Sequence, residues 1–496
     1  MSATRTFSKI RDEFFDFVIR EYPTTATYLG IHNRDTLLTM WSEEDISRRR
    51  KELKSFIGQL RRIDRRKLSI EDRVDYELLL GNLLTEQKWD EKFKPEKSNP
   101  GTYMNFGLYV LLEREFAAAE RRARSILSRL RKIPKILEQG KENLENPPKV
   151  YTDSAILSAR GQVAFLEGPL KSFASRLKGP ENEELRRELK DAIAKASDAL
   201  KSFIKFLELE LLPRSTGNYA IGKSFFNFIL KNHHQVEVTA DELLAFGKKQ
   251  IARVKRELTE TAREISPRKS WEKLVDELKK DHPDNDELVA YYAKEMKRAR
   301  DFVKKKGLVT FPPSEKLKVV PTPDFARPLI PYAAFIPPAP FEKEKVGIFW
   351  VTTAPEDAPK KKIQEQLEGH PKAGIVVTAL HEGYPGHHLQ LSISAYHPDK
   401  LRHLLGTSVF VEGWALYCEE LMWEQGFYDD PRCRLLQLKD ELWRACRVVI
   451  DVSLHTGRMS FDDAVKFLVK VARLEEVNAI SEVRRYCQSP TQPMSY

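Results

Sequence analysis

The chain has 496 residues and a mass of 57.4 kDa, enough for two or three average domains or for one large body with two lobes. Hydrophobic residues make up 41% of it, which suffices for a buried core, and charged residues make up 31%. The net charge of +10 is a thin excess with both signs interspersed, which excludes a polybasic nucleic-acid arm and an acidic disordered chain. We therefore expect no nucleic-acid partner.

The N-terminal segment, MSATRTFSKIRDEFFDF, carries charged residues where a signal peptide needs an apolar run. No segment reaches about 18 uninterrupted apolar residues, so we expect no membrane span and no membrane partner. The four cysteines all lie in the last fifth and lack metal-finger spacing, which argues against a disulfide framework. These observations predict a cytoplasmic protein and leave its oligomeric state open.

Residues 1–307 have the pattern of a helical N-terminal lobe. Apolar residues recur at steps of three and four, with Arg, Lys and Glu between them. Ser42, Ser69 and Thr239 stand where helix N-caps are expected. The predicted helices lie at about 43–63, 70–88, 112–140, 152–178, 183–212, 239–264 and 286–305.

Residues 308–369 differ in composition, with nine prolines between Pro312 and Pro340 and β-like runs at 317–321, 331–338 and 346–353. Because proline cannot donate to a strand ladder, we expect edge strands or loop here. Residues 370–496 return to a helical pattern, at about 371–396, 402–425, 431–457 and 461–470. The predicted fold is mostly α, with a small irregular β element at about 317–353, and the three segments are expected to form one continuous fold.

Histidine is unevenly distributed. Seven of the 11 histidines fall between His370 and His455. Histidine is the commonest metal ligand and a frequent acid or base, so this window is where we expect chemistry.

The sequence around His381 is KAGIVVTALHEGYPGHH. In the HExxH motif, two His one helical turn apart bind zinc and the Glu activates the metal-bound water. Here Pro385 occupies the fourth position after His381, and His387 and His388 follow at offsets of six and seven. Pro385 and Gly386 disfavour a regular helix. A bulged or kinked helix would bring His387 back toward His381, which favours His387 over His388 as the second ligand.

A catalytic zinc needs a third protein ligand and an open position. Glu412 follows His387 by 25 residues and lies in the apolar run SVFVEGWALY, where an acid needs a partner. Glu419, on the same helix face, is expected to orient a ligand histidine. We therefore predict one Zn²⁺ held by His381, by His387 or His388, and by Glu412.

Glu382 is the predicted general base, which takes the proton of water and passes it to the leaving amine. The tetrahedral intermediate needs a further donor. His455, in DVSLHTG, and Tyr486, in VRRYCQSP, are the candidates, with Tyr496 a weaker one.

Several motifs resemble those of a known family, catalogued as domain of unknown function 885. They are HEGYPGHHLQ at 381–390, EGWALY at 412–417, DVSLHTGRMS at 451–460, EVRRYCQSPTQPMSY at 482–496, ATYLGIHNRD at 26–35 and LSIEDRVDYELLL at 68–80. The resemblance covers nearly the whole chain. The family is largely α-helical and resembles gluzincin metallopeptidases, whose long helices surround a deep substrate channel.

The resemblance implies a large two-lobed body around a central channel. It also implies His381, His387 or His388, and Glu412 as zinc ligands, with Glu382 as base. Chains of this family usually continue past the step to Tyr496 with a further helical segment, which this sequence does not contain.

These patterns together predict a zinc-dependent hydrolase that cleaves peptide bonds in short peptides, as a carboxypeptidase or oligopeptidase. Its partner would be a short peptide or small amide substrate, and Arg484 or Arg485 is a candidate for holding a peptide carboxylate. Two alternatives stay open. One is a metal-dependent hydrolase of non-peptide amides or esters, and the other is a catalytically inactive helical binding scaffold.

Overall fold

The computed structural model describes residues 2–323, 327, 330, 332–355 and 358–496. The chain divides into two compact units. The first comprises Met1–Tyr219, Ala339–Lys343 and Pro398–Leu405, and the second comprises Ala220–Pro338, Glu344–His397 and Gly406–Tyr496. The boundaries expected from composition, after residues 307 and 369, both fall inside the second unit. The three predicted segments therefore describe changes in composition along the chain, and not the two compact units.

The first unit is helical. Ser42 and Ser69 cap two of its helices as predicted, each side chain accepting a backbone N–H three residues on. The helix predicted at 112–140 is instead divided, and Pro134 stands in the first turn of α8, where a missing N–H costs nothing. Its helices are α1 (Ala3–Glu21), α2 (Pro23–Leu29), α3 (Glu43–Leu60), α4 (Ile70–Phe93), α5 (Pro95–Ser98), α6 (Leu108–Glu113), α7 (Ala119–Leu130), α8 (Ile133–Asn143), α9 (Lys149–Phe165), α10 (Lys171–Ser175) and α11 (Glu183–Phe206).

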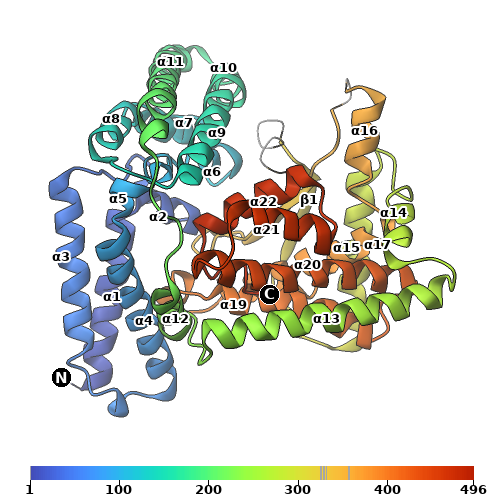
Figure 1. Cartoon of the computed structure of the whole chain (residues 1–496). Coiled ribbons are helices and arrows are strands. Elements are labelled where there is room, and N and C mark those ends of the chain that lie inside the picture. The colour runs from blue at the N-terminus through green and yellow to red at the C-terminus, as the bar shows by residue number, and fades with distance from the viewer. Residues whose placement is uncertain (1, 324–326, 328–329, 331, 356–357) are drawn as a thin grey trace. The chain divides into compact units, whose positions relative to one another are not determined.

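The second unit holds the remaining described helices and a small sheet. Its helices are α12 (Lys223–Asn232), α13 (Ala240–Ile265), α14 (Trp271–Leu278), α15 (Leu288–Lys306), α16 (Lys360–Leu367), α17 (Lys372–Glu382), α18 (His387–Ala395), α19 (Ser408–Glu424), α20 (Pro431–His455), α21 (Phe461–Phe467) and α22 (Glu476–Gln488). The long helices α13 and α20 lie side by side (Figure 1). They run antiparallel, because Arg253 pairs with Glu441 while Glu257 pairs with Arg434.

The sheet has three strands in the order β1-β3-β2, namely β1 (Lys316–Pro321), β3 (Val346–Val351) and β2 (Ala333–Ile336). β1 pairs with β3 in parallel, with Lys316 opposite Val346, and β2 pairs with β3 antiparallel, with Ala333 opposite Val351. The expected β-like runs therefore form strands, apart from Pro331, which lies outside the described residues. β3 is the central strand rather than an edge, and its run VGIFWV contains no proline.

One face of the sheet helps to fix helix α17. Phe349 and Val351 of β3 pack with Tyr292 and Met296 of α15 and with Ala379 of α17, and all five are buried. At about 25 cal/mol for each Å² of apolar surface removed from water, such a cluster anchors the helix strongly. The last turn of α17, which carries His381 and Glu382, is therefore held by the sheet and by α15.

The prediction of a mostly α fold with a small β element is confirmed. The channel implied by the family resemblance stays a prediction. No helix in the described part of the chain is both long enough and apolar enough to cross a bilayer.

Candidate metal centre

The predicted motif residues stand at a sharp break between two helices of the second unit. Helix α17 ends at Glu382, the chain turns through Gly383–Gly386 with a cis bond before Pro385, and α18 begins at His387. A Cβ at Gly386 would lie 1.7 Å from the backbone oxygen of His381, so only glycine permits this turn. The helix predicted at 371–396 is thus two helices, and the break returns the chain toward His381.

Among the described residues, one group of three side chains has the composition and spacing of a metal site. His381, Glu382 and His387 each offer a ligand atom, and these atoms all lie within 4.8 Å of one another. The two imidazole rings stand edge to face, with their centroids 4.8 Å apart. Both rings are buried, whereas the Glu382 side chain is half-buried. His387, six residues after His381, therefore lies beside it.

Helix α19 supplies two carboxylates from the same face. An Oε2 atom of Glu412 lies 3.5 Å from Nε2 of His387, and Oε1 of Glu419 lies 2.6 Å from Nδ1 of His381. Glu419 is 1% exposed, so it is enclosed behind His381. When Nδ1–H donates to Glu419, the lone pair of Nε2 on His381 is free for a metal, which is the usual arrangement behind a ligand histidine.

Burial shifts the pKa values of these groups. Burial raises the pKa of Glu382, and the charge of Glu412 adds to the rise, although the charge of His387 opposes it. Burial also raises the pKa of Glu419 well above its ordinary value and lowers that of His381 well below. Burial, the largest single influence, lowers the pKa of His387, but Glu412 and the charge of Glu382 together outweigh burial, so the pKa rises.

His388, the other candidate for second ligand, faces different neighbours. It is 0% exposed, with Nε2 3.4 Å from Oε1 of Glu315, and its ring stands edge to face with those of Tyr384 and Phe335. Glu315 also accepts hydrogen bonds from Tyr384 and Arg300. The structure therefore separates the adjacent histidines. His387 joins His381, and His388 anchors the turn to the residues around Glu315.

Two residues that contact this turn, Glu315 and Trp414, were not identified from the sequence. Glu315 ties down both His388 and Tyr384, yet nothing in its local run, PPSEKLKVV, marks it as special. Trp414 donates from Nε1 to the backbone oxygen of Pro385 at 2.9 Å and thereby ties α19 to the turn. Both contacts join segments that are distant in sequence.

The predicted donors His455 and Tyr486 are fully buried and lie close to each other. Nε2 of His455 lies 3.0 Å from the backbone oxygen of Tyr486, and the Tyr486 hydroxyl accepts a hydrogen bond from Trp443 at 3.2 Å. These contacts hold α22 against α20. His455 is not part of the group formed by His381, Glu382 and His387.

Tyr496, the weaker candidate, is the tyrosine that reaches the site. Burial raises the pKa of Tyr496 and Glu412 adds to the rise, and the Tyr496 ring lies 4.0 Å from the guanidinium of Arg447 and 5.5 Å from that of Arg444. Arg444 was not identified from the sequence. The expected carboxylate-binding residue Arg485 instead pairs with Glu482 at 2.7 Å.

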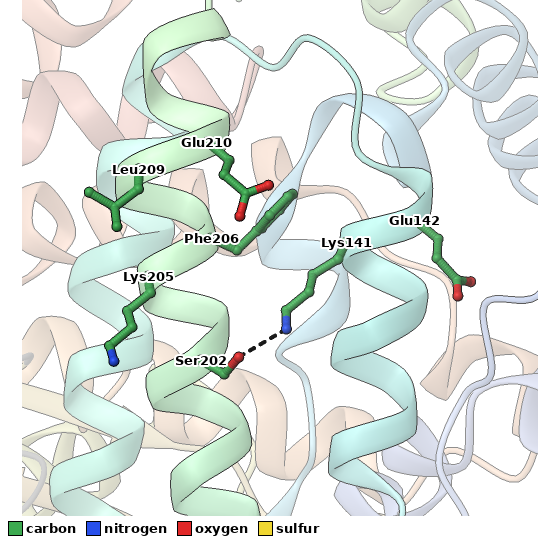
Figure 2. Close-up of a pocket in the computed structure, with 7 residues that line it drawn as sticks. All are labelled: Lys141, Glu142, Ser202, Lys205, Phe206, Leu209 and Glu210. Atoms are coloured by element: carbon green, nitrogen blue, oxygen red, sulfur yellow. Dashed lines mark hydrogen bonds between the residues drawn. The ribbon is translucent and has the colours of Figure 1, made fainter.

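Other cavities of the protein lack this chemistry. A pocket of about 390 Å³ between α8 and α11 is shown in Figure 2, where Lys141 donates to Ser202 across 3.0 Å. A second, of about 350 Å³, is bordered by α3 and α4 and includes Trp41 and Glu86. Neither is lined by histidine or cysteine among the described residues, so neither rivals the site around His381.

Comparison with known proteins agrees with the fold and leaves the chemistry open. A family model described as "Bacterial protein of unknown function (DUF885)" matches residues 23–496. No curated protein gives a significant match.

The four cysteines are free and buried, as expected of small apolar side chains.

Two solved structures share the fold over nearly the whole chain. One, from Shewanella oneidensis, is described as a putative lipoprotein of unknown function. It is 24% identical, with a TM-score of 0.79, and the match covers 99% of this chain and 91% of that one. The other, a putative lipoprotein from Colwellia psychrerythraea, is 19% identical, with a TM-score of 0.85, and the match covers 100% and 91%.

These descriptions correct one expectation. A cytoplasmic location was inferred from the N-terminal residues and the cysteine pattern, and the description of both similar structures as lipoproteins contradicts it. Lipoproteins are membrane-anchored or secreted. The absence of an apolar run at the N-terminus was therefore an inadequate basis for assigning a compartment.

Proposed function

Because the chain belongs to the DUF885 family of bacterial proteins of unknown function, we propose its activity from the site itself: it is a zinc-dependent hydrolase that cleaves peptide bonds in short peptides. The observation that carries the proposal is the convergence of His381, Glu382 and His387 within 4.8 Å, with Glu412 beside His387.

The donor set fits a catalytic zinc. Two imidazole nitrogens and one carboxylate oxygen make a three-ligand set of the kind that catalytic sites use, with a fourth position left open. The enclosed carboxylate of Glu419 holds the His381 ring in place. In this assignment His381, His387 and Glu412 hold the ion, and Glu382 is left as the acid–base group. When bound, zinc acts as a Lewis acid and lowers the pKa of a coordinated water to about 7.

Glu382 holds and transfers the proton in the proposed reaction. Its carboxylate removes a proton from the attacking water and delivers it to the leaving amine. Burial, the largest influence, raises its pKa, which makes it a better proton carrier near neutral pH than an exposed glutamate. Its half-buried side chain remains reachable by substrate.

Tyr496 is placed to assist. Burial raises the pKa of Tyr496, so the phenol keeps its proton and can donate a hydrogen bond to a developing oxyanion. This gives Tyr496 the role that the sequence offered to His455 or Tyr486.

The peptide substrate rests on the likeness of the motif to gluzincin metallopeptidases and on the sheet. Strands β1 and β2 lie at the two edges of the three-stranded sheet, and an exposed edge can pair with an extended peptide. A non-peptide amide would use the same acid–base chemistry, so the assay includes both kinds of substrate.

The proposal is tested with zinc-loaded protein on a mixed library of short peptides and simple amides. Glu382→Gln removes the base and keeps the side-chain shape, so we expect hydrolysis to fall by roughly 10² to 10⁴-fold while zinc content stays at one per chain. Glu424→Gln, an exposed glutamate on α19, is the matched control and should retain full activity.

Two results would contradict the proposal. Full activity of Glu382→Gln would remove Glu382 as the base, and cleavage of no library member by zinc-loaded wild-type protein would remove the peptidase. Cleavage of simple amides but of no peptide would assign the site to non-peptide substrates.

A further inference from the structure

Helix α20 carries a stripe of ionisable side chains along one face. Asp440, Arg444, Arg447, Asp451 and His455 recur at steps of three and four and therefore share one face of the helix. A charged group inside a protein is costly unless it is paired, so each member of the stripe needs a partner.

The C-terminal residues supply partners for the distal part of this stripe. Arg447 donates from Nε to the backbone oxygen of Pro493 at 3.1 Å. Asp451 accepts backbone N–H groups of Thr491 and Met494 at 3.3 and 3.2 Å. Arg447 and Asp451 therefore hold the C-terminal segment in place.

Arg444 has far fewer partners than it can satisfy. Its Nη1 lies 3.5 Å from the backbone oxygen and 3.9 Å from Oδ1 of Asp440, which is a weak pair. Its Nε is buried and has no hydrogen-bond partner among the described residues. A guanidinium offers five N–H donors in a planar fork, and the described residues give Arg444 only this weak pair.

Arg444 also stands beside the metal site. Its guanidinium lies 5.5 Å from the ring of Tyr496, and the C-terminal segment that ends there reaches Glu412, which accepts a hydrogen bond from Nε2 of Gln492 at 3.2 Å. The side chain is 16% exposed, so it is not sealed off from solvent.

We propose that Arg444 binds the C-terminal carboxylate of the peptide substrate, which makes the enzyme a carboxypeptidase. A guanidinium pairs with a carboxylate through two parallel hydrogen bonds, and this use would satisfy the donors that the protein leaves unused. The site otherwise presents the acids Glu382 and Glu412, which repel a substrate carboxylate. This inference rests on the proposed peptidase function and adds the substrate class to it.

The reaction balances without any additional reactant. Water adds across the C-terminal peptide bond, so that its oxygen bonds to the carbonyl carbon and the C–N bond breaks. One proton of the water reaches the leaving amine by way of Glu382. The products are a shortened peptide and a released amino acid.

The test compares N-blocked tripeptides that end in a free acid with the same peptides ending in an amide. For wild-type protein we expect the free acids to have the lower KM. Arg444→Gln should raise the KM for free acids by about 10- to 100-fold and change kcat less, because a hydrogen bond to a charged group contributes that much to binding. Cleavage of the amides should change far less than cleavage of the acids, and Arg444→Lys should restore part of the loss for the acids.

Arg458→Gln is the matched control, because Arg458 is half-exposed and pairs with Asp241 away from the stripe. Its KM values should equal those of wild-type protein. Equal KM values for acids and amides in wild-type protein, or an equal loss for both in Arg444→Gln, would overturn the role of Arg444.

A binding measurement separates failure of this inference from failure of the proposed function. Calorimetry on zinc-loaded Glu382→Gln should show tighter binding of free acids than of amides, and adding Arg444→Gln should abolish the difference. If this preference appears while wild-type protein cleaves no peptide, the peptidase proposal fails and the carboxylate site stands. If binding shows no preference, the carboxylate site fails whatever the hydrolysis assay gives.

Discussion

The two adjacent histidines, His387 and His388, have opposite surroundings. His387 is 9% exposed and faces Glu412, whereas His388 is 0% exposed and faces Glu315. A Cβ at Gly347 of strand β3 would lie 2.5 Å from Nδ1 of His388, so that strand fits closely over the ring. One histidine is thus available to an ion, and the other is packed as part of the scaffold.

This difference predicts that the two residues fail in different ways when replaced. His387→Asn should lower zinc affinity by at least about 100-fold with little loss of stability, because it removes a ligand. His388→Asn should lower the free energy of unfolding by about 1–3 kcal/mol, because Glu315 loses a buried partner. Zinc titration with a chromogenic competitor and urea unfolding measure the two effects. Loss of zinc in His388→Asn with retention in His387→Asn would reverse the assignment.

For single residues, the sequence predicted a role where the signal lay in the neighbouring residues. His381, Glu382 and His387 lie within one short motif, and Glu412 stands out as an acid in an apolar run. Glu315 did not stand out, because its contact with His388 exists only after the sheet and α18 have packed. The missed Arg444 did leave a signal, a charged residue at helical spacing from Asp440 and Asp451 in a buried helix.

The break between α17 and α18 is the element that forms the site. The pattern predicted a helix over 371–396 that is kinked or bulged at Pro385 and Gly386, because apolar spacing continues on both sides of these residues. The Gly383–Gly386 turn interrupts it, and the backbone N–H of Gly386 donates to the oxygen of Leu380 at 3.1 Å. On an unbroken helix, a residue six positions on would point about 120° away from His381.

Gly386 is the position where this element is most sensitive. Gly386→Ala should abolish stoichiometric zinc binding and cost on the order of 3 kcal/mol or more, because the new Cβ collides with the backbone of His381. Gly58→Ala, in α3, meets nothing within 4 Å and should instead stabilise by about 0.5–1 kcal/mol. Thermal unfolding with and without zinc measures both. A Gly386→Ala protein that binds zinc normally would show that the turn does not set the site.

Helix starts were the other well-predicted feature of the elements. Thr239, at an expected position, forms a capping box with Glu242. Helix ends and interruptions were less predictable. The stretch expected as one helix at 152–178 contains a π-helical turn at Leu166–Leu170 between α9 and α10.

On the scale of the whole molecule, composition and periodicity gave the mostly α class and the small sheet. They did not give the two compact units, because the first unit takes in Ala339–Lys343 and Pro398–Leu405 from far along the chain. Returns of this kind depend on tertiary packing, and no linker-like composition marks them.

Asp451 should make the stability of the molecule depend on pH. Burial raises its pKa to about 8, and the backbone N–H groups of Thr491 and Met494 offset this only in part. Its ordinary value is 3.8, so between about pH 4 and pH 8 the folded chain holds a proton that the unfolded chain has lost. This stabilising contribution is fully present below about pH 4 and is lost as the pH rises to about 8.

Asp451→Asn should therefore flatten the dependence. Compared with wild-type protein, the variant should become relatively more stable between pH 4 and pH 8, by on the order of a few kcal/mol. Urea unfolding across that range measures the difference, and Asp276→Asn, an exposed position on α14, should follow wild-type protein. Parallel pH curves for Asp451→Asn and wild-type protein would contradict the assignment.

The most direct test of the site is an anomalous-difference map from zinc-soaked crystals, recorded on both sides of the zinc edge. We expect one peak about 2.0–2.1 Å from Nε2 of His381 and from Nε2 of His387, with a carboxylate oxygen of Glu412 completing the protein ligands. A map with no peak between those two histidines, or with its peak at His388 and Glu315, would contradict the proposed metal centre.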